Sequence, residues 1–195
     1  GGWGLYTDEG STGIRMWNNL VCGVKTGGFH QHYGRENAIE NNIFVNSLKD
    51  QLQRTRDEEH LSFWFRNNIV YWDNDGTLFG NNWRGGVRGE KDGRPTQHYE
   101  LGPNLYWHRS GKQELFPGKK TLAQWQAETG QDRGSLVADP LFRDPVAGDF
   151  RLRDGSPAEK VGFKPFDTAS AGPADPCQLP DWPVRPVPTR YELRK

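Results

Sequence analysis

Short apolar segments that follow polar pairs recur along the first hundred residues. An Asn-Asn pair precedes three of them, at Asn18-Asn19, Asn41-Asn42 and Asn67-Asn68, and Asn104 precedes a fourth. A short segment of alternating apolar and polar residues stands in front of each pair, at 14–17, 38–40 and 63–66. The interval is 23 residues from Asn19 to Asn42, 26 to Asn68 and 36 to Asn104. A strand-turn-strand unit repeated in this way predicts the stacked coils of a β-solenoid.

The paired asparagines suit the corners of such coils. Asn tolerates the left-handed backbone conformation of a tight corner, and its amide can bond the equivalent amide of the next coil. In the alternative, an antiparallel sandwich, the same pairs would be ordinary turn residues. Their constant phase relative to the apolar segments favours the solenoid.

Two segments lengthen the later repeats. Residues 48–60 are highly charged and compatible with a helix on the surface, and residues 83–100 form an excursion rich in Gly and Arg. A second helix is predicted at 121–128, with Thr121 as N-cap and Gly130 as its stop, and we expect it to cap or flank the solenoid.

Composition divides the chain. All 12 Asn lie between Asn18 and Asn104, whereas all 13 Pro lie at or beyond Pro95. We therefore predict a β-solenoid domain at 1–167, with insertions at 48–60 and 83–100, and an extended Pro-rich tail at 168–195. Hydrophobic residues make up only 33% of the chain but aromatic residues 12%, which indicates a folded, loop-rich β-protein rather than a disordered one.

Charge and cysteine content exclude several classes. The formal net charge of zero argues against nucleic acid as a partner, and no apolar run is long enough to span a membrane. Cys22 and Cys177 match no metal or redox spacing and are predicted to be unrelated thiols, with a long-range disulfide as the alternative. The start at Gly1 without Met or an apolar leader indicates an interior cut that leaves out any signal peptide.

The chain resembles the right-handed parallel β-helix repeat proteins, which are found mostly among secreted bacterial proteins that act on polysaccharides. The resemblance rests on the Asn-Asn corners, on the Gly-rich segments 4–11 and 27–34, and on the closing segment 138–158, and it covers about residues 1–167. It implies an all-β right-handed parallel β-helix of about four coils. Function stays open, because this architecture hosts lyases, glycosidases, esterases and binding modules.

One wall of the predicted helix gathers reactive side chains. The 23-residue offset of the Asn pairs places Tyr6 beside Phe29, Thr7 beside His30, Asp8 beside Gln31 and Glu9 beside His32, and the rows continue at Phe79 and Asn82. Neighbouring coils are about 4.8 Å apart. Two carboxylates, Asp8 and Glu9, would then meet two imidazoles, His30 and His32, that alternate along one strand.

Four interpretations of this wall stay open. The four side chains suit hydrogen bonding to sugar hydroxyls, and they also suit acid and base roles in glycoside hydrolysis. A polar ladder at a solenoid corner requires no ligand. His30, His32 and Glu36 resemble half of a metal motif, and Asp73 and Asp75 the start of a calcium loop, but neither motif is complete, so no metal or cofactor is predicted.

Aromatic residues beside Gly-rich turns suit the apolar faces of sugar rings. Trp3, Tyr6, Tyr33, Trp72 and Trp83 are of this kind, and Trp83 with Arg84 is the expected exposed platform. Phe63, Trp64, Phe65 and Phe79 are expected in the interior. The predicted ligand-binding set is Trp3, Tyr6, Asp8, Glu9, His30, His32, Tyr33, Trp83 and Arg84.

These residues predict a secreted bacterial module that recognises a plant cell-wall polysaccharide beside an attached or upstream catalytic domain. The zero net charge favours a neutral, xylan-like glycan. One alternative is the C-terminal part of a β-helix glycoside hydrolase or polysaccharide lyase, with Asp8, Glu9, His30 and His32 in its active groove. A structural scaffold is the second alternative.

Overall fold

The chain is an all-β protein in which short strands return repeatedly to the same three sheets. The computed structural model describes residues 2–83, 86–92 and 94–168, so the predicted tail lies outside the described residues from 169 onward, as do Cys177 and Arg84. Every strand pair in these three sheets is parallel.

Each sheet collects equivalent strands of successive repeats. The first sheet has the order β1 (Leu5–Thr7), β4 (Phe29–Gln31), β7 (Asp50–Arg54) and β10 (Thr77–Asn81). The second has the order β2 (Arg15–Trp17), β5 (Asn37–Glu40), β8 (Phe63–Arg66) and β13 (Glu100–Leu101). The third has the order β3 (Leu20–Cys22), β6 (Ile43–Val45), β9 (Ile69–Trp72), β14 (Leu105–His108) and β15 (Leu136–Val137).

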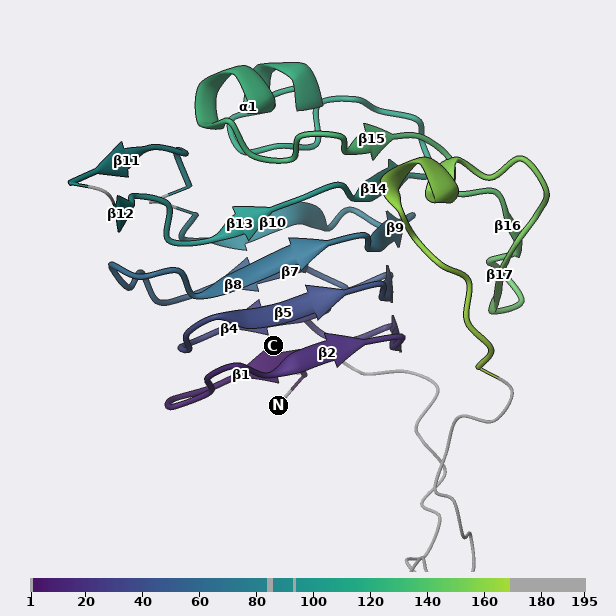
Figure 1. Ribbon diagram of the computed structural model, residues 1–195. Coiled ribbons are helices and arrows are strands. Elements are labelled where there is room, and N and C mark those ends of the chain that lie inside the picture. Colours follow the sequence, from purple (N-terminus) through teal and green to yellow (C-terminus); the bar gives the residue numbers. More distant parts are fainter. Residues whose placement is uncertain (1, 84–85, 93, 169–195) are drawn as a thin grey trace, which may run out of the picture.

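The chain passes from the first sheet to the second and the third and then begins again one layer higher (Figure 1). This stacked parallel arrangement is compatible with the predicted solenoid. Two antiparallel hairpins and two helical segments complete the described chain: β11 (Glu90–Lys91) with β12 (Arg94–Pro95), β16 (Phe142–Asp144) with β17 (Asp149–Leu152), α1 (Leu122–Thr129) and the 3-10 helix η1 (Pro157–Val161).

The Asn pairs form the corners between the second and third sheets. The first Asn of each pair has a left-handed backbone, with φ of 56° at Asn18, 55° at Asn41 and 57° at Asn67. The second Asn lies in a ladder along the stack, in which Nδ2 of Asn42 donates to Oδ1 of Asn68 at 3.0 Å. The ladder runs through Asn19, Asn42, Asn68 and Asn104. Both predicted roles of the asparagines are therefore confirmed.

The interior is filled by an inward row from each sheet. In the first sheet Leu5, Phe29, Leu52 and Phe79 are register partners along the stack, and Phe29 and Leu52 are fully buried. The third sheet is apolar on both faces, because residues 142–166 pack over its outer side against Ile43, Ile69 and Leu105. The outer faces of the first and second sheets carry polar side chains, and these two faces position the sites described below.

Helix α1 covers the end of the stack formed by β10, β13 and β14 (Figure 1). Its predicted N-cap is confirmed, since the Thr121 side chain and Gln124 form a reciprocal capping box, and left-handed Gly130 ends the helix. Trp125 enters the main core, and its indole Nε1 donates to Oδ2 of buried Asp132 at 3.0 Å.

Three sequence predictions about single segments were wrong. Residues 50–54 form strand β7 of the first sheet, not a surface helix. Trp64 does not fill the interior, because β8 alternates and places Phe63 and Phe65 inside while Trp64 is half-buried. Trp72 is fully buried rather than exposed on a turn, and its Nε1 donates to the Gly76 carbonyl at 2.9 Å.

Candidate functional site

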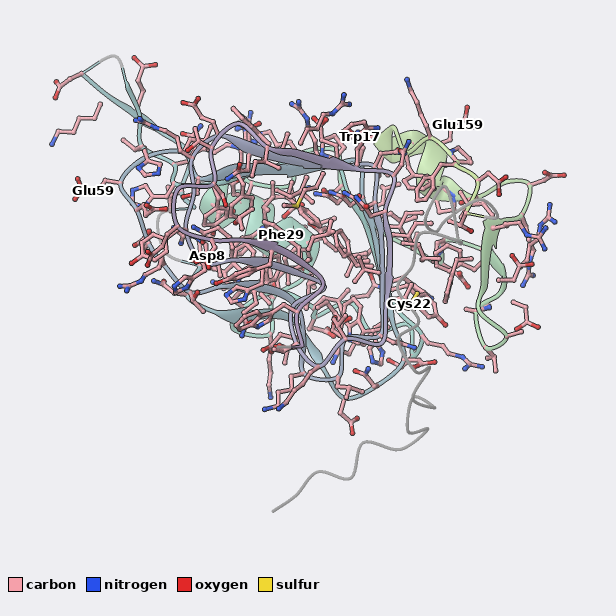
Figure 2. The ribbon with its side chains drawn as sticks, turned by 90° about the horizontal axis from the view of Figure 1, so that it is seen from below. Asp8, Trp17, Cys22, Phe29, Glu59 and Glu159 are labelled. Atoms are coloured by element: carbon pink, nitrogen blue, oxygen red, sulfur yellow. The ribbon has the colours of Figure 1, made fainter. Side chains whose placement is uncertain are left out.

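The outer face of the first sheet carries the predicted site, with its register shifted by one residue. The partners across β1 and β4 are Leu5 with Phe29, Tyr6 with His30, and Thr7 with Gln31. Phe29 points into the coil and Asp8 lies outside it (Figure 2). Because side chains alternate along a strand, Tyr6 and His30 share the outer face. The predicted pairings of Tyr6 with Phe29 and of Thr7 with His30 were wrong, and Thr7 is buried beside Gln31.

The shift originates in one turn. Thr7 pairs with Gln31, whereas Thr12 forms an isolated bridge with Arg35. The first coil therefore uses one residue more between these points than the second. An offset taken from the Asn corners cannot be carried across a turn whose length differs between coils.

The two imidazoles meet on one hydroxyl group from the next coil. Nε2 of His30 lies 3.0 Å from Oγ1 of Thr55, and Nδ1 of His32 lies 2.8 Å from the same oxygen. The prediction that His30 and His32 share a face is confirmed. Thr55 follows β7, and its backbone N–H donates to the Gln31 carbonyl at 3.0 Å, which fixes its place in the stack.

This shared hydroxyl couples the tautomers of the two rings. The Thr55 hydroxyl has one proton and two lone pairs, so it donates to at most one of the two imidazoles and accepts from a ring nitrogen that carries a proton. In the arrangement in which it donates to one neutral ring and accepts from the other, Nδ1 of His30 and Nε2 of His32 are one donor and one acceptor. Nδ1 of His30 is buried and has no hydrogen-bond partner in the described part of the chain.

Aromatic rings surround the imidazoles and form a continuous surface. We call Trp3, Tyr6, His30, His32 and Tyr33 the aromatic patch. Trp3 stacks on Tyr6 with ring centroids 4.7 Å apart and meets the edge of His30 at 4.8 Å. His32 meets Tyr33 edge-on at 4.7 Å, and Tyr6 lies 5.1 Å from His30. Trp3 is 42% exposed, so the patch offers at least one large open ring.

Charge in the patch is set by burial. Burial, followed by the neighbouring His32, lowers the pKa of His30 to about 4, so this imidazole is neutral at pH 7. Burial and then the Asp8 carboxylate raise the pKa of the Tyr6 hydroxyl. A base with a pKa near 4 is poorly matched to proton transfer at neutral pH, and a neutral imidazole is well suited to hydrogen bonding.

Asp8 and Glu9 lie at the Tyr6 side of the patch. Both are exposed, and Asp8 reaches Tyr6 through its charge and a side-chain hydrogen bond, while Glu9 acts on Tyr6 through charge alone. Among the described residues neither carboxylate hydrogen-bonds to an imidazole of the patch. The structure therefore brings together His30, His32, Trp3, Tyr6 and Tyr33, with the carboxylates at the rim.

Trp83 is not the expected exposed platform. It is half-buried against the main core, with ring centroids 4.4 Å from Phe79 and 5.2 Å from Tyr99. Its Nε1 donates to the Gly80 carbonyl at 2.9 Å, and its own carbonyl accepts from the Tyr99 hydroxyl at 2.7 Å. The predicted partner Arg84 lies outside the described residues.

Two residues that contact the aromatic patch were missed by the sequence analysis. Thr55 joins the imidazoles, and the Arg56 guanidinium lies over the Tyr33 ring, 4.9 Å from its centroid. Both follow β7, which had been interpreted as part of a charged helix. The signal that marks this strand is Leu52, which is 23 residues after Phe29 in sequence and is its register partner.

Side-chain amides hold the turn that carries Asp73 and Asp75. In the turn at Asp73 and Asp75, Oδ1 of Asn46 accepts from the Asp73 N–H at 2.9 Å, and Oδ1 of Asn74 accepts from the Gly76 N–H at 2.8 Å. Within the described ranges no three His, Cys, Asp or Glu side chains are grouped to hold a metal ion. None of the helices described there is long and apolar enough to cross a membrane.

Comparison with known proteins gives one distant relative. No family model matches the chain, and no solved structure matches it significantly. The chain is similar to the Bacillus subtilis protein named "Uncharacterized protein YwoF", with 26% identity over 161 residues, 77% of this chain. The matched region spans 32% of the length of that relative.

Proposed function

We propose that the chain is a right-handed parallel β-helix of about four coils that serves as a carbohydrate-recognising module. Its preferred ligand is a neutral, xylan-like polysaccharide of plant cell walls. In this proposal the protein is secreted by a bacterium and works beside an attached or upstream catalytic domain. The stacked parallel sheets and the Asn ladder support the fold, and the aromatic patch supports the function.

The observation that carries the proposal is the combination of open rings with neutral hydrogen-bonding groups. Trp3 and Tyr6 are stacked 4.7 Å apart, and Trp3 is 42% exposed. Sugar rings present an apolar C–H face that packs on an aromatic plane while their hydroxyls need paired donors and acceptors. Half-buried His32 and Tyr6 supply polar groups beside the open ring, and Asp8 at the rim adds a carboxylate acceptor.

The parallel stack also fits an extended ligand. Tyr6 and His30 are register partners, and Thr55 continues the outer surface into the third coil, so polar groups repeat about every 4.8 Å along the stack. A regular wall of this kind suits a polymer of repeating sugar units better than a compact small molecule.

The test is affinity for insoluble xylan and for xylo-oligosaccharides, measured with the wild-type chain and with Trp3→Ala. Loss of the exposed Trp3 ring is expected to weaken binding by at least about tenfold, which is the effect typical of removing an aromatic residue that anchors a ligand. Trp64→Ala is the matched control, since Trp64 lies on the second sheet and has no ring contact among the described residues. Equal losses in both variants, or no binding by the wild type, would refute the proposal.

The coupled imidazoles favour a second candidate, the C-terminal part of a β-helix glycoside hydrolase or lyase. A donor and an acceptor joined by Thr55 form a short path for a proton. Release of new reducing ends or unsaturated products that disappears in His30→Ala would establish this alternative. Binding to xylan without product release supports the module, and absence of binding to any glycan leaves the scaffold interpretation.

A further inference from the structure

A groove lies on the outer face of the second sheet, separate from the aromatic patch. It has a volume of about 550 Å³, within the range of roughly 300–1,000 Å³ usual for ligand sites. Its floor is the outward row of register partners Trp17, Glu40 and Arg66. Its far wall is formed by the C-terminal segment around Lys164 and Pro165.

The wall is held in place by the Asn corners. The Lys164 N–H donates to Oδ1 of Asn41 at 2.6 Å, and Nδ2 of Asn41 donates back to the Lys164 carbonyl at 2.7 Å. Nδ2 of Asn67 donates to the Val161 carbonyl at 2.7 Å. The groove is therefore built between rigid elements and needs little ordering when a ligand enters.

Cationic groups dominate the groove. Nε of Arg15 donates to one oxygen of Glu40 at 2.8 Å, and Nε of Arg66 donates to the other at 2.6 Å. Burial opposes ionisation of Glu40, but the two arginines hold its pKa below the ordinary value. The Arg15 and Arg66 side chains stay 60% and 46% exposed, and Lys164 adds a third positive charge against this one carboxylate.

An open aromatic ring stands at the same place. Trp17 is 50% exposed, and the Arg15 guanidinium lies 5.0 Å from its ring centroid. In Figure 2 Trp17 points away from the coil interior on the side where η1 lies. An indole beside guanidinium groups offers a stacking surface for a sugar ring and charge-assisted hydrogen bonds for an oxyanion.

We propose that this groove binds an anionic sugar, a saccharide unit that carries a carboxylate or a sulfate group. Trp17 packs on the ring, and Arg15, Arg66 and Lys164 hold the oxyanion. The site is independent of the neutral-glycan function proposed for the aromatic patch, because no residue is shared and the two surfaces belong to different sheets.

The experiment follows the indole N–H signals of Trp17 and Trp3 by NMR, assigned with Trp17→Ala and Trp3→Ala, during titration with oligosaccharides. The probes are an oligogalacturonate, a heparin-derived sulfated tetrasaccharide and neutral xylotetraose. An anionic probe is expected to shift the Trp17 signal with an affinity that falls as salt is raised, and xylotetraose is expected to leave that signal unchanged. The anionic probe with the higher affinity identifies the oxyanion.

Lys164→Gln is expected to lower the affinity for the anionic probe by about tenfold, because it removes one charged contact and leaves the ion pairs of Arg15 and Arg66 with Glu40 intact. Arg133→Gln is the matched control, an exposed cation outside the groove. No shift of Trp17 with either anionic probe, equal shifts with xylotetraose, or equal affinity for inorganic sulfate would overturn the proposal. If an anionic probe shifts the Trp17 signal but xylotetraose does not shift the Trp3 signal, only the neutral-glycan function is refuted.

Discussion

Replacement of Asn68 by Ala tests whether the buried Asn ladder holds the coils together. The Asn68 side chain is fully buried in the middle of the ladder. Its Oδ1 accepts from the backbone N–H and from Nδ2 of Asn42, at 2.9 and 3.0 Å. Its Nδ2 donates to the Ile39 carbonyl at 2.9 Å and to Oδ1 of Asn104 at 3.2 Å.

The expected loss of unfolding free energy depends on which groups keep a hydrogen-bond partner after the substitution. Without the amide, Nδ2 of Asn42 still donates to the Met16 carbonyl, and Oδ1 of Asn104 still accepts from the Asn68 N–H. The backbone N–H of Asn42 loses its acceptor in a buried position. One orphaned buried donor costs about 1–3 kcal/mol, and each of the three other lost hydrogen bonds adds about 1 kcal/mol, so we expect Asn68→Ala to lower the free energy of unfolding by about 4–6 kcal/mol.

Asn19→Ala is the control within the same ladder. Asn19 is its first member, and among the described residues no group donates to its Oδ1. Asn19→Ala removes the two hydrogen bonds that Nδ2 of Asn19 donates, to the Trp17 carbonyl and to Oδ1 of Asn42. Oδ1 of Asn42 still accepts from the Asn19 N–H, so no buried group loses its partner and the expected cost is about 2 kcal/mol. Urea unfolding followed by Trp fluorescence gives both values by linear extrapolation. A difference between the two variants below about 1 kcal/mol would refute the ladder as a source of stability.

Two further predictions concern pH. Burial raises the pKa of Asp132 to about 6 although Ser135, Tyr106 and Trp125 donate to it, so its favourable contribution is complete below pH 3.8 and is lost as pH rises through 6. Between pH 4 and 7 the unfolding free energy of wild type relative to Asp132→Asn should fall by about 2 kcal/mol, and a constant difference would contradict this. His30 has its pKa lowered to about 4, so folding is weakened as pH falls from 6.5 to 4; an NMR titration that finds an ordinary histidine pKa would disprove its burial.

The coil corners were predictable because their chemistry is local. Each corner needs a residue with a left-handed backbone, followed by a residue with a buried side-chain amide. Few residues other than Asn suit both of these positions, so the corners can be recognised as Asn-Asn pairs in the sequence. The structure adds one variation at the fourth corner, where Pro103 replaces the left-handed Asn and Asn104 still extends the ladder. Helix α1 was predictable for the same reason, because Thr121 and Gly130 mark its ends.

Strand β7 was missed because its polar residues are buried against residues that lie far away in the sequence. Arg54 is fully buried inside the coil, where Nη2 donates to Oδ1 of Asp57 at 2.7 Å and the guanidinium lies 5.0 Å from the Tyr99 ring centroid. In the sequence this arginine belongs to a charged run typical of a solvated helix. The Asn82 carbonyl, 28 positions further along, accepts from Nη1 of Arg54, and Tyr99 lies further along still. Such partners cannot be recognised from local periodicity.

The aromatic patch shows which parts of a site in a stacked fold depend on strands and which on turns. His30 and His32 lie on one side whatever the register, because they are two residues apart at the end of β4, His30 within the strand and His32 directly after it. The groups that meet them depend on the lengths of the turns in neighbouring coils. A shift of one residue exchanges the inner and outer faces, so the longer turn after Thr7 brings Tyr6, not Thr7, beside His30. The same dependence places Thr55 under both imidazoles, and that contact, not the predicted carboxylate pair, determines the proton arrangement of the patch.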